Sequence, residues 1–126
     1  MKTIKSTTPP RQPVVIQKLK SAFSDWISIA PHVPKIARYG LGAKIESSFV
    51  SLLDITHQAV FAKTERKGTL IDHAIIRLDT LSFFLHIAYE NKLVPQKKYL
   101  VLAEKLADIG KNLGGWKKFI ESKLKK

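Results

Sequence analysis

The sequence predicts an all-α protein, folded as an antiparallel up-down-up-down four-helix bundle. Along four long segments, apolar residues recur every three or four positions, and the alternation typical of β-strands is absent. The links between these segments are short and contain proline or glycine. The chain has 126 residues, 44% of them hydrophobic, which suits one domain with a substantial core. Four long helices with short links pack most simply as antiparallel neighbours.

The first predicted element is a helix that follows a polar segment. Residues 1–12 are polar and basic, so we expect a flexible basic arm ahead of a bundle domain at residues 13–124. The arm either reaches for phosphate groups or is a frayed terminus without a role. Pro13 suits the first turn of a helix, and Pro31 ends that helix. Its apolar face comprises Val15, Ile16, Leu19, Ala22, Phe23, Trp26, Ile27 and Ala30.

The second predicted helix opens at Gly40 and runs to about Lys63, after a helical turn at residues 35–38. Residues 64–68 are then predicted to form a loop that ends at a glycine. The inner face of this helix comprises Leu41, Ile45, Ser48, Phe49, Leu52, Thr56, Ala59 and Val60.

The third and fourth predicted helices have less regular starts. Thr69 followed by Asp72 resembles a capping box, with Asp in place of the usual Glu or Gln, and this helix ends near Asn91. The fourth helix begins at Pro95, although Val94 is a poor cap. The inner faces comprise Leu70, Ala74, Leu78, Leu81, Leu85 and Ala88 on the third helix, and Tyr99, Leu102, Ala103, Leu106, Ile109, Gly110, Leu113 and Ile120 on the fourth.

The second and third helices carry more apolar surface than one bundle core needs. A helix that is apolar nearly all round is buried on more than one side, which favours contact with another copy of the chain over scattered exposed apolar residues. Arg77 lies at the edge of the inner face, where it either forms an interface ion pair or extends to solvent. The predicted oligomer interface comprises Val50, Phe61, Ile76, Phe83 and Ile87.

No motif in the sequence supports catalysis or metal binding. The chain has no cysteine, and no two of its four histidines lie three or four positions apart. The carboxylates are scattered singly, and neither a Glu-x-x-His motif nor a phosphate-binding glycine loop is present. Gly110, Gly114 and Gly115 lie inside the fourth helix, where we expect them to permit close helix packing. We therefore expect a non-enzymatic protein without a cofactor or metal.

Targeting signals are also absent from the sequence. No apolar run approaches the roughly 20 residues that a membrane span needs. No apolar segment follows the N-terminal lysines, as it would in a secretory signal. We therefore expect a cytoplasmic protein with no membrane partner.

The charge of the chain is its strongest functional signal. It has 22 Lys and Arg residues against 10 Asp and Glu, a net charge of +12 that exceeds what solubility needs. This excess favours a polyanionic partner, above all nucleic acid, over a merely basic surface. Trp116 lies among lysines, and its ring either stacks on a base or packs in the core. The predicted nucleic-acid-binding residues are Arg38, Lys44, Arg66, Lys67, Arg77, Lys98, Lys105, Lys111, Trp116, Lys118 and Lys123.

The order and spacing of short motifs along residues 14–120 resemble two related families. The run from Pro34 to Ile45 resembles the junction of the first two helices in the four-helix proteins encoded in intervening sequences of large ribosomal RNA genes. Residues 77–116 more closely resemble their relatives, the accessory variability determinant proteins of diversity-generating retroelements. The matching features are Leu81, Leu85, Ala88, the helix start at Pro95, Ile109-Gly110-Lys111 and Gly114-Gly115-Trp116.

This resemblance implies a four-helix bundle that assembles into a barrel-like homopentamer and binds a reverse transcriptase together with template RNA or DNA. The complex would support error-prone synthesis of complementary DNA, in which the accessory protein is not the catalyst. Arg77 lies in the basic and aromatic region of the family's third helix. A second arginine of that region is His86 here, and the polar cap before the fourth helix is Val94 here.

Two other functions remain open from the sequence. The chain is either a bundle protein of the intervening-sequence type without a reverse transcriptase partner, or a structural protein or enzyme subunit with no nucleic-acid role. A neighbouring reverse transcriptase gene and a repeated template region would distinguish the first of these from a retroelement protein. Neutralising Lys105, Lys111 and Lys118 together would leave the function intact in the second.

Overall fold

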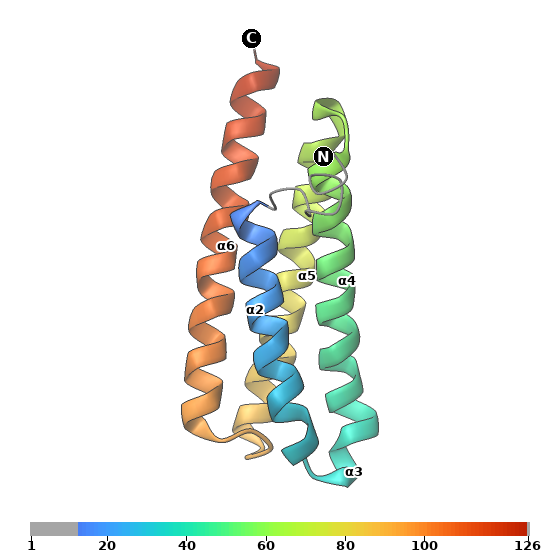
Figure 1. The fold of residues 1–126 in the computed structure, drawn as a ribbon, viewed down its shortest axis with the longest axis vertical. Coiled ribbons are helices and arrows are strands. Elements are labelled where there is room, and N and C mark those ends of the chain that lie inside the picture. Colours follow the sequence, from blue (N-terminus) through green and yellow to red (C-terminus); the bar gives the residue numbers. More distant parts are fainter. Residues whose placement is uncertain (1–12, 126) are drawn as a thin grey trace, which may run out of the picture.

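The structure is a computed structural model that describes residues 13–125. The predicted arm at residues 1–12 therefore lies outside the described residues. Short connections join four long helices that lie side by side along one axis (Figure 1). No strand occurs within residues 13–125, and the prediction of an all-helical bundle is confirmed. The long helices are α2 (Val14–Ile29), α4 (Ala43–Phe61), α5 (Thr64–Glu90) and α6 (Gln96–Leu124).

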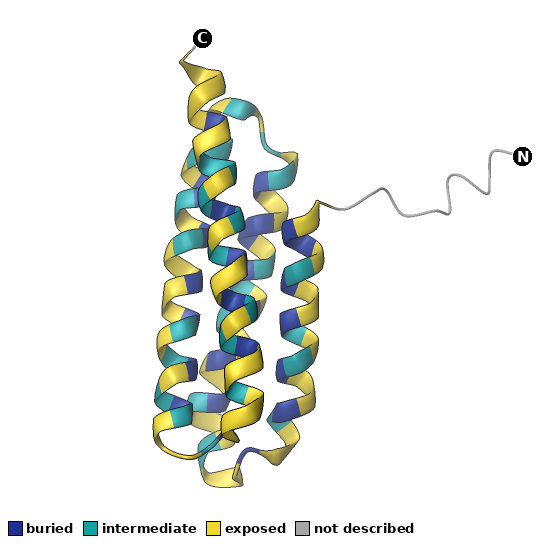
Figure 2. Ribbon diagram, turned by 90° about the vertical axis from the view of Figure 1, so that its left-hand side faces the viewer, coloured by how far each residue is buried: buried dark blue, intermediate teal, exposed yellow. Residues whose placement is uncertain are grey.

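All four long helices contribute to one apolar core. Buried positions face inward and exposed positions face solvent (Figure 2). Trp26 and Phe49 are the bulkiest fully buried side chains. The buried Thr56 hydroxyl donates to the Leu52 carbonyl oxygen at 2.7 Å, so this polar group keeps a partner inside the core. The predicted inner faces are largely buried, including Leu19, Ala22, Ile45, Leu52, Ala74, Leu81, Leu85, Leu102, Leu106, Ile109 and Leu113.

One residue of α2 that the sequence predicts to lie in the core is exposed. Ile27 is 46% exposed, whereas Ile29 is buried. The buried positions of α2 follow the helical repeat through Leu19, Ala22 and Trp26, and the next residue on that line is Ile29. The prediction that Ile27 faces the core is therefore wrong.

The connection from α2 to α4 is more helical than the sequence predicts. A 3₁₀ turn (Ala30–His32) follows α2 and contains Pro31. The short helix α3 (Lys35–Ala37) then runs through a π-helical segment, η2 (Arg38–Gly42), directly into α4. Gly40 thus lies within a continuous helical path and does not open a new helix. A π-helical insertion of this kind adds residues without ending the helix.

The connection from α4 to α5 also differs from the prediction. The predicted loop at residues 64–68 and the predicted capping box at Thr69 are both wrong, because α5 begins at Thr64 and passes through Gly68. A glycine inside a helix costs about 1 kcal/mol relative to alanine. Other contacts at this turn must therefore offset that cost.

Lys67, in the first turn of α5, supplies such contacts. Its Nζ atom donates hydrogen bonds to the carbonyl oxygens of Ala59 at 2.9 Å and Val60 at 2.7 Å. The last carbonyl groups of a helix have no partner within that helix, and the cationic lysine suits the negative end of α4. Glu65 in the first turn of α5 suits the positive end of that helix.

The three glycines of α6 do not share one role. A Cβ atom at Gly110 would lie 3.4 Å from Leu78 Cδ2, so Gly110 allows α6 to approach α5 closely. A Cβ atom at Gly114 or Gly115 would meet no neighbour within 4 Å. The prediction of close packing is therefore confirmed for Gly110 and wrong for Gly114 and Gly115.

Candidate nucleic-acid interface

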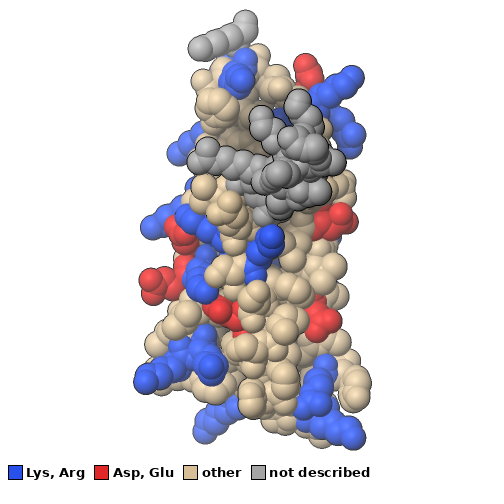
Figure 3. Space-filling model, in the orientation of Figure 1, with Lys and Arg blue, Asp and Glu red and all other residues tan. Residues whose placement is uncertain are grey.

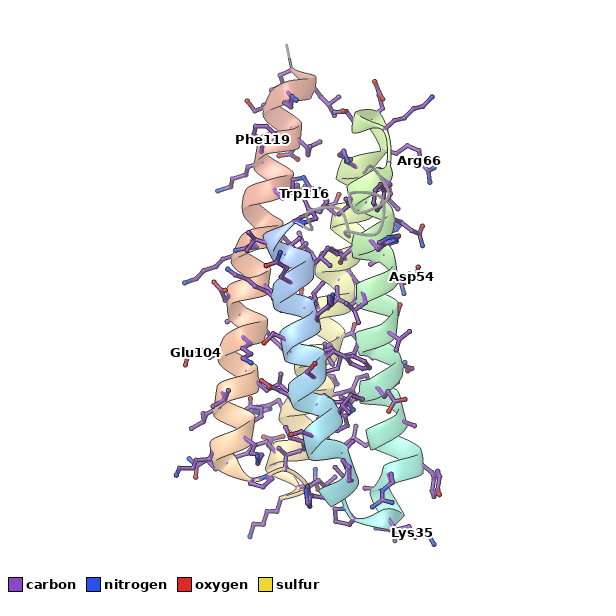
Figure 4. All side chains as sticks on the ribbon, viewed as in Figure 1. Lys35, Asp54, Arg66, Glu104, Trp116 and Phe119 are labelled. Carbon is purple, nitrogen blue, oxygen red and sulfur yellow. The ribbon has the colours of Figure 1, made fainter. Side chains whose placement is uncertain are left out.

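Many of the exposed basic residues lie toward the two ends of the bundle. Arg66 projects near the upper end and Lys35 lies at the lower end (Figure 4). On the face drawn in Figure 3, carboxylates lie among the basic side chains in the middle of the bundle. We define the upper basic end as Lys63, Arg66, Lys118, Lys123 and Lys125, and the lower basic end as Lys35, Lys44, Lys92, Lys97 and Lys98, all of which are exposed.

Ion pairs neutralise several lysines between the two ends. Lys18 Nζ lies 2.6 Å from Asp108 Oδ2, and Lys105 Nζ lies 2.6 Å from Asp25 Oδ2. Lys105 also donates to the Ser21 hydroxyl at 2.9 Å. These pairs hold α2 against α6. The paired carboxylates partly neutralise the two lysines and so weaken their attraction for a phosphate group.

The lysines predicted along α6 therefore divide into separate sites. Lys98 belongs to the lower end and Lys123 to the upper end, about 38 Å apart at the rise of an α-helix. Lys111 is exposed between the ends, whereas Lys105 is half-buried in its ion pair. Lys118 lies at the upper end. The charges therefore do not favour a single nucleic-acid strand bound along one face of α6.

Trp116 and Lys67 contact each other at the upper end. Lys67 Nζ lies 5.8 Å from the centroid of the Trp116 ring, within the range of a cation–π contact. Trp116 is partly buried and packs against the core. It also lines a shallow pocket with Val14, Val15 and Val60. Lys67 and Trp116 therefore both have structural roles where α4, α5 and α6 meet.

The remaining predicted basic residues have varied surroundings. The Arg38 guanidinium donates to the carbonyl oxygens of Pro31 at 3.0 Å and Val33 at 3.1 Å, and so fixes the turn after α2. Lys44 Nζ lies 5.6 Å from the centroid of the Phe84 ring. Because these contacts use backbone carbonyls and a ring face, neither cation is neutralised.

Arg77 is exposed and donates to the Ser51 hydroxyl, which links α5 to α4. The sequence left two alternatives for Arg77, an interface ion pair or extension to solvent, and in the structure the side chain lies at the surface. It shares a cleft of about 390 Å³ with Lys44, and the other residues that line the cleft carry hydroxyl groups. Two cations and several hydroxyls without a carboxylate suit a phosphate group. The hydroxyl residues are Ser47, Ser48, Ser51 and Thr80.

Most of the predicted oligomer-interface residues are exposed in the single chain. Val50 and Phe61 lie on α4, and Ile76 and Phe83 lie on α5; all four are exposed, and Ile87 is partly buried. The sequence did not identify Ile36 and Tyr39 as exposed apolar residues, since they fall within and directly after the helical turn predicted at residues 35–38. The other large apolar residues that it missed on the surface are Val14, Leu100, Val101, Phe119 and Leu124.

Lys117 on α6 pairs with the Asp72 carboxylate of the neighbouring helix α5. The pKa of Lys117 is raised above its ordinary value, chiefly by the hydrogen bond to the Asp72 carboxylate. Desolvation opposes this shift, while the negative charges of Asp72 and Glu121 add to it. Lys117 is thus held as a cation by α5 and by its own helix, α6.

Two further features bear on function. Within residues 13–125, no group of three or more His, Cys, Asp and Glu side chains is placed to hold a metal ion. No helix in that range is long and apolar enough to cross a membrane.

The comparisons with known proteins agree with the sequence motifs. The model of the bAvd-like family matches residues 13–120, which include nearly all of the four long helices. No curated protein and no solved structure matches the chain. The match covers well over half of the 126 residues, and it confirms the resemblance to accessory variability determinant proteins. This chain belongs to the bAvd-like family.

Proposed function

We propose that this protein is a non-catalytic accessory protein of a diversity-generating retroelement, which binds a reverse transcriptase and nucleic acid and supports mutagenic retrohoming. Membership of the bAvd-like family is the observation that carries the proposal. The net charge of +12 and the two basic ends support binding to template RNA or complementary DNA. The proposal places the protein in the cytoplasm, where such synthesis takes place.

The proposed assembly is a homopentameric barrel of antiparallel up-down-up-down bundles. A closed ring needs two different contact surfaces on each copy, so that each copy binds the next. The exposed apolar residues Phe61 on α4 and Ile76 and Phe83 on α5 suit this role, because they lie on two different helices. Five aligned copies would bring their basic ends together into two rings of positive charge.

Nucleic-acid binding is tested with single-stranded RNA at increasing salt concentrations. Because each phosphate contact releases condensed counterions, log Kd should rise steeply with log salt, with a slope of about 0.7 for each contact on a single strand. Replacing Lys118 and Lys123 together by Gln should reduce this slope. Binding that does not change with salt would refute the electrostatic part of the proposal.

The protein partner and the assembly need separate measurements. Co-purification of the chain with a reverse transcriptase encoded beside it would support the adaptor role. Sedimentation or native mass measurement should give a pentamer, and a monomer at all concentrations would refute the ring. If RNA binding is found but no reverse transcriptase is encoded nearby, the protein has the alternative function, that of an intervening-sequence-type bundle protein.

A further inference from the structure

A groove lies between the C-terminal half of α2 and the N-terminal half of α4. It has a volume of about 900 Å³, and it continues along the π-helical segment that precedes α4. Trp26 and Val33 form part of its apolar lining, and Val50 and Tyr39 are its large exposed apolar side chains. The groove is therefore large enough to receive several side chains of a partner.

One residue that lines this groove, Trp26, has a buried polar group without a partner among the described residues. Trp26 is only 1% exposed, and its indole N–H has no hydrogen-bond acceptor among the described residues. Buried N–H groups are nearly always paired in folded proteins, because losing water without gaining a partner is unfavourable.

The edge of the groove is acidic, although the protein as a whole is strongly basic. Glu46 and Asp54 lie two helical turns apart on α4, with Val50 between them. Neither carboxylate forms an ion pair with another residue in the described range. Arg38 also lines the groove, but its guanidinium is already bonded to the carbonyl oxygens of Pro31 and Val33.

We infer that this groove binds a cationic, amphipathic segment of a protein partner, with its apolar side chains over Trp26 and Val50 and its cations beside Glu46 and Asp54. Nucleic acid fits poorly, since its phosphates would meet two carboxylates without counter-ions. The division of charge supports this assignment: the two ends of the bundle attract polyanions, while the groove between α2 and α4 attracts polycations. The inference deepens the proposed function and rests on it, because it assigns a docking surface to the protein partner.

The test uses the whole chain and two synthetic helical peptides of about 18 residues, or five turns. One contains only Leu and Lys in an amphipathic pattern, and the other has Glu in place of every Lys. The readout is the pair of indole N–H signals in a ¹H–¹⁵N correlation spectrum, since Trp26 lines the groove and Trp116 lies at the upper end. We expect the Lys peptide to shift the Trp26 signal and leave the Trp116 signal in place.

Charge-neutralising variants then locate the binding site. The double variant Glu46→Gln with Asp54→Asn should raise the Kd of the Lys peptide roughly tenfold, as expected when two charge-assisted contacts are lost. Glu104→Gln is the matched control, because Glu104 is an exposed carboxylate of α6 on the other side of the bundle from Asp54 (Figure 4). It should leave the Kd unchanged. Both variants are surface changes and should keep the melting temperature of the parent protein.

Three outcomes would overturn the inference. The first is a Lys peptide that leaves the Trp26 signal unmoved, and the second is a stronger shift with the Glu peptide or with single-stranded RNA. The third is a Trp26 signal that shifts, without any peptide, as the concentration of the protein rises. This would mean that a second copy of the chain occupies the groove. RNA binding by the parent protein separates the two proposals: if the parent binds RNA but does not bind the Lys peptide, the groove assignment fails and the nucleic-acid role stands. If RNA binding is absent from the parent protein as well, the proposed function itself fails.

Discussion

Lys67 joins three helices, because its Nζ atom binds the last turn of α4 and lies 5.8 Å from the centroid of the Trp116 ring on α6. This position makes Lys67 a structural residue, although the sequence placed it in the nucleic-acid surface. The side chain of its neighbour Arg66 is exposed and forms no hydrogen bond or ion pair with another described residue. Two adjacent basic residues thus have different roles at the upper basic end.

Replacing Lys67 by Met should lower stability by about 1–2 kcal/mol, through the loss of two hydrogen bonds from a charged donor and of the contact with Trp116. Chemical denaturation measures this change. Arg66→Met is the control, with an expected change within about 0.5 kcal/mol. Affinity for RNA should show the reverse order, with the larger loss in Arg66→Met. Equal stability of the two variants would show that Lys67 has no structural role.

A similar division applies to Lys105 and Lys98 on α6. Lys105→Gln removes the ion pair with Asp25 and the hydrogen bond to Ser21, both of which join α6 to α2. The groups are about one-third exposed, so we expect a modest loss of about 0.5–1 kcal/mol, measured by thermal unfolding. Lys98→Gln should leave stability unchanged and weaken RNA binding. If Lys105→Gln weakens RNA binding more than Lys98→Gln does, then Lys105 leaves its ion pair to reach phosphate.

The pKa of Lys117 gives a prediction about pH. A raised pKa in the folded state means that the contribution of the Lys117–Asp72 pair is fully present below the ordinary value of 10.5. The contribution is lost as the pH rises through the raised pKa, when Lys117 loses its proton. The pair should therefore be intact at neutral pH and fail only in strong alkali.

Asp72→Asn tests this prediction directly. The lysine side-chain NMR signals should report a lower pKa for Lys117 in this variant, because the largest cause of its shift is gone. Glu121→Gln should lower the pKa less, since the Glu121 carboxylate lies 3.9 Å from Lys117 Nζ. The free energy of unfolding of Asp72→Asn and of the parent protein should converge in alkali. A pKa that is the same in all three proteins would rule out the pair as its cause.

The sequence predicted the core well because burial follows the helical repeat. Leu81, Leu85 and Ala88 on α5, like Leu102 and Leu106 on α6, recur at the spacing that places them on one face, and all five are buried. This pattern depends only on residues within one helix, so no knowledge of the tertiary contacts is needed. The family motifs were recognised for the same reason, since they follow order and spacing along the chain.

Several errors concern contacts between helices. Gly68 suggested the end of a loop, but Lys67 bonds to the end of the preceding helix and α5 begins earlier. Lys105 resembled its lysine neighbours on the helical wheel, yet its partner Ser21 lies 84 residues away in the sequence. Whether a lysine is paired or free depends on which helices become neighbours, and helical periodicity does not reveal that. The groove beside Trp26 is equally hidden, because it forms only when α2 meets α4.

The glycines of α6 allow a final prediction about packing and propensity. Gly115 lies within a long helix, is exposed and has open space where a Cβ atom would be, so Gly115→Ala should raise stability by about 0.5–1 kcal/mol through helix propensity alone. Gly110→Ala gains the same propensity but presses on Leu78 at 3.4 Å, so its net gain should be smaller. Thermal unfolding compares the two variants. Equal gains would mean that Leu78 moves aside freely and that Gly110 is not needed for the approach of α6 to α5. If the Gly115→Ala chain is more stable but no longer assembles, Gly115 lies at the contact between copies. The glycine would then allow assembly while lowering the stability of the single chain.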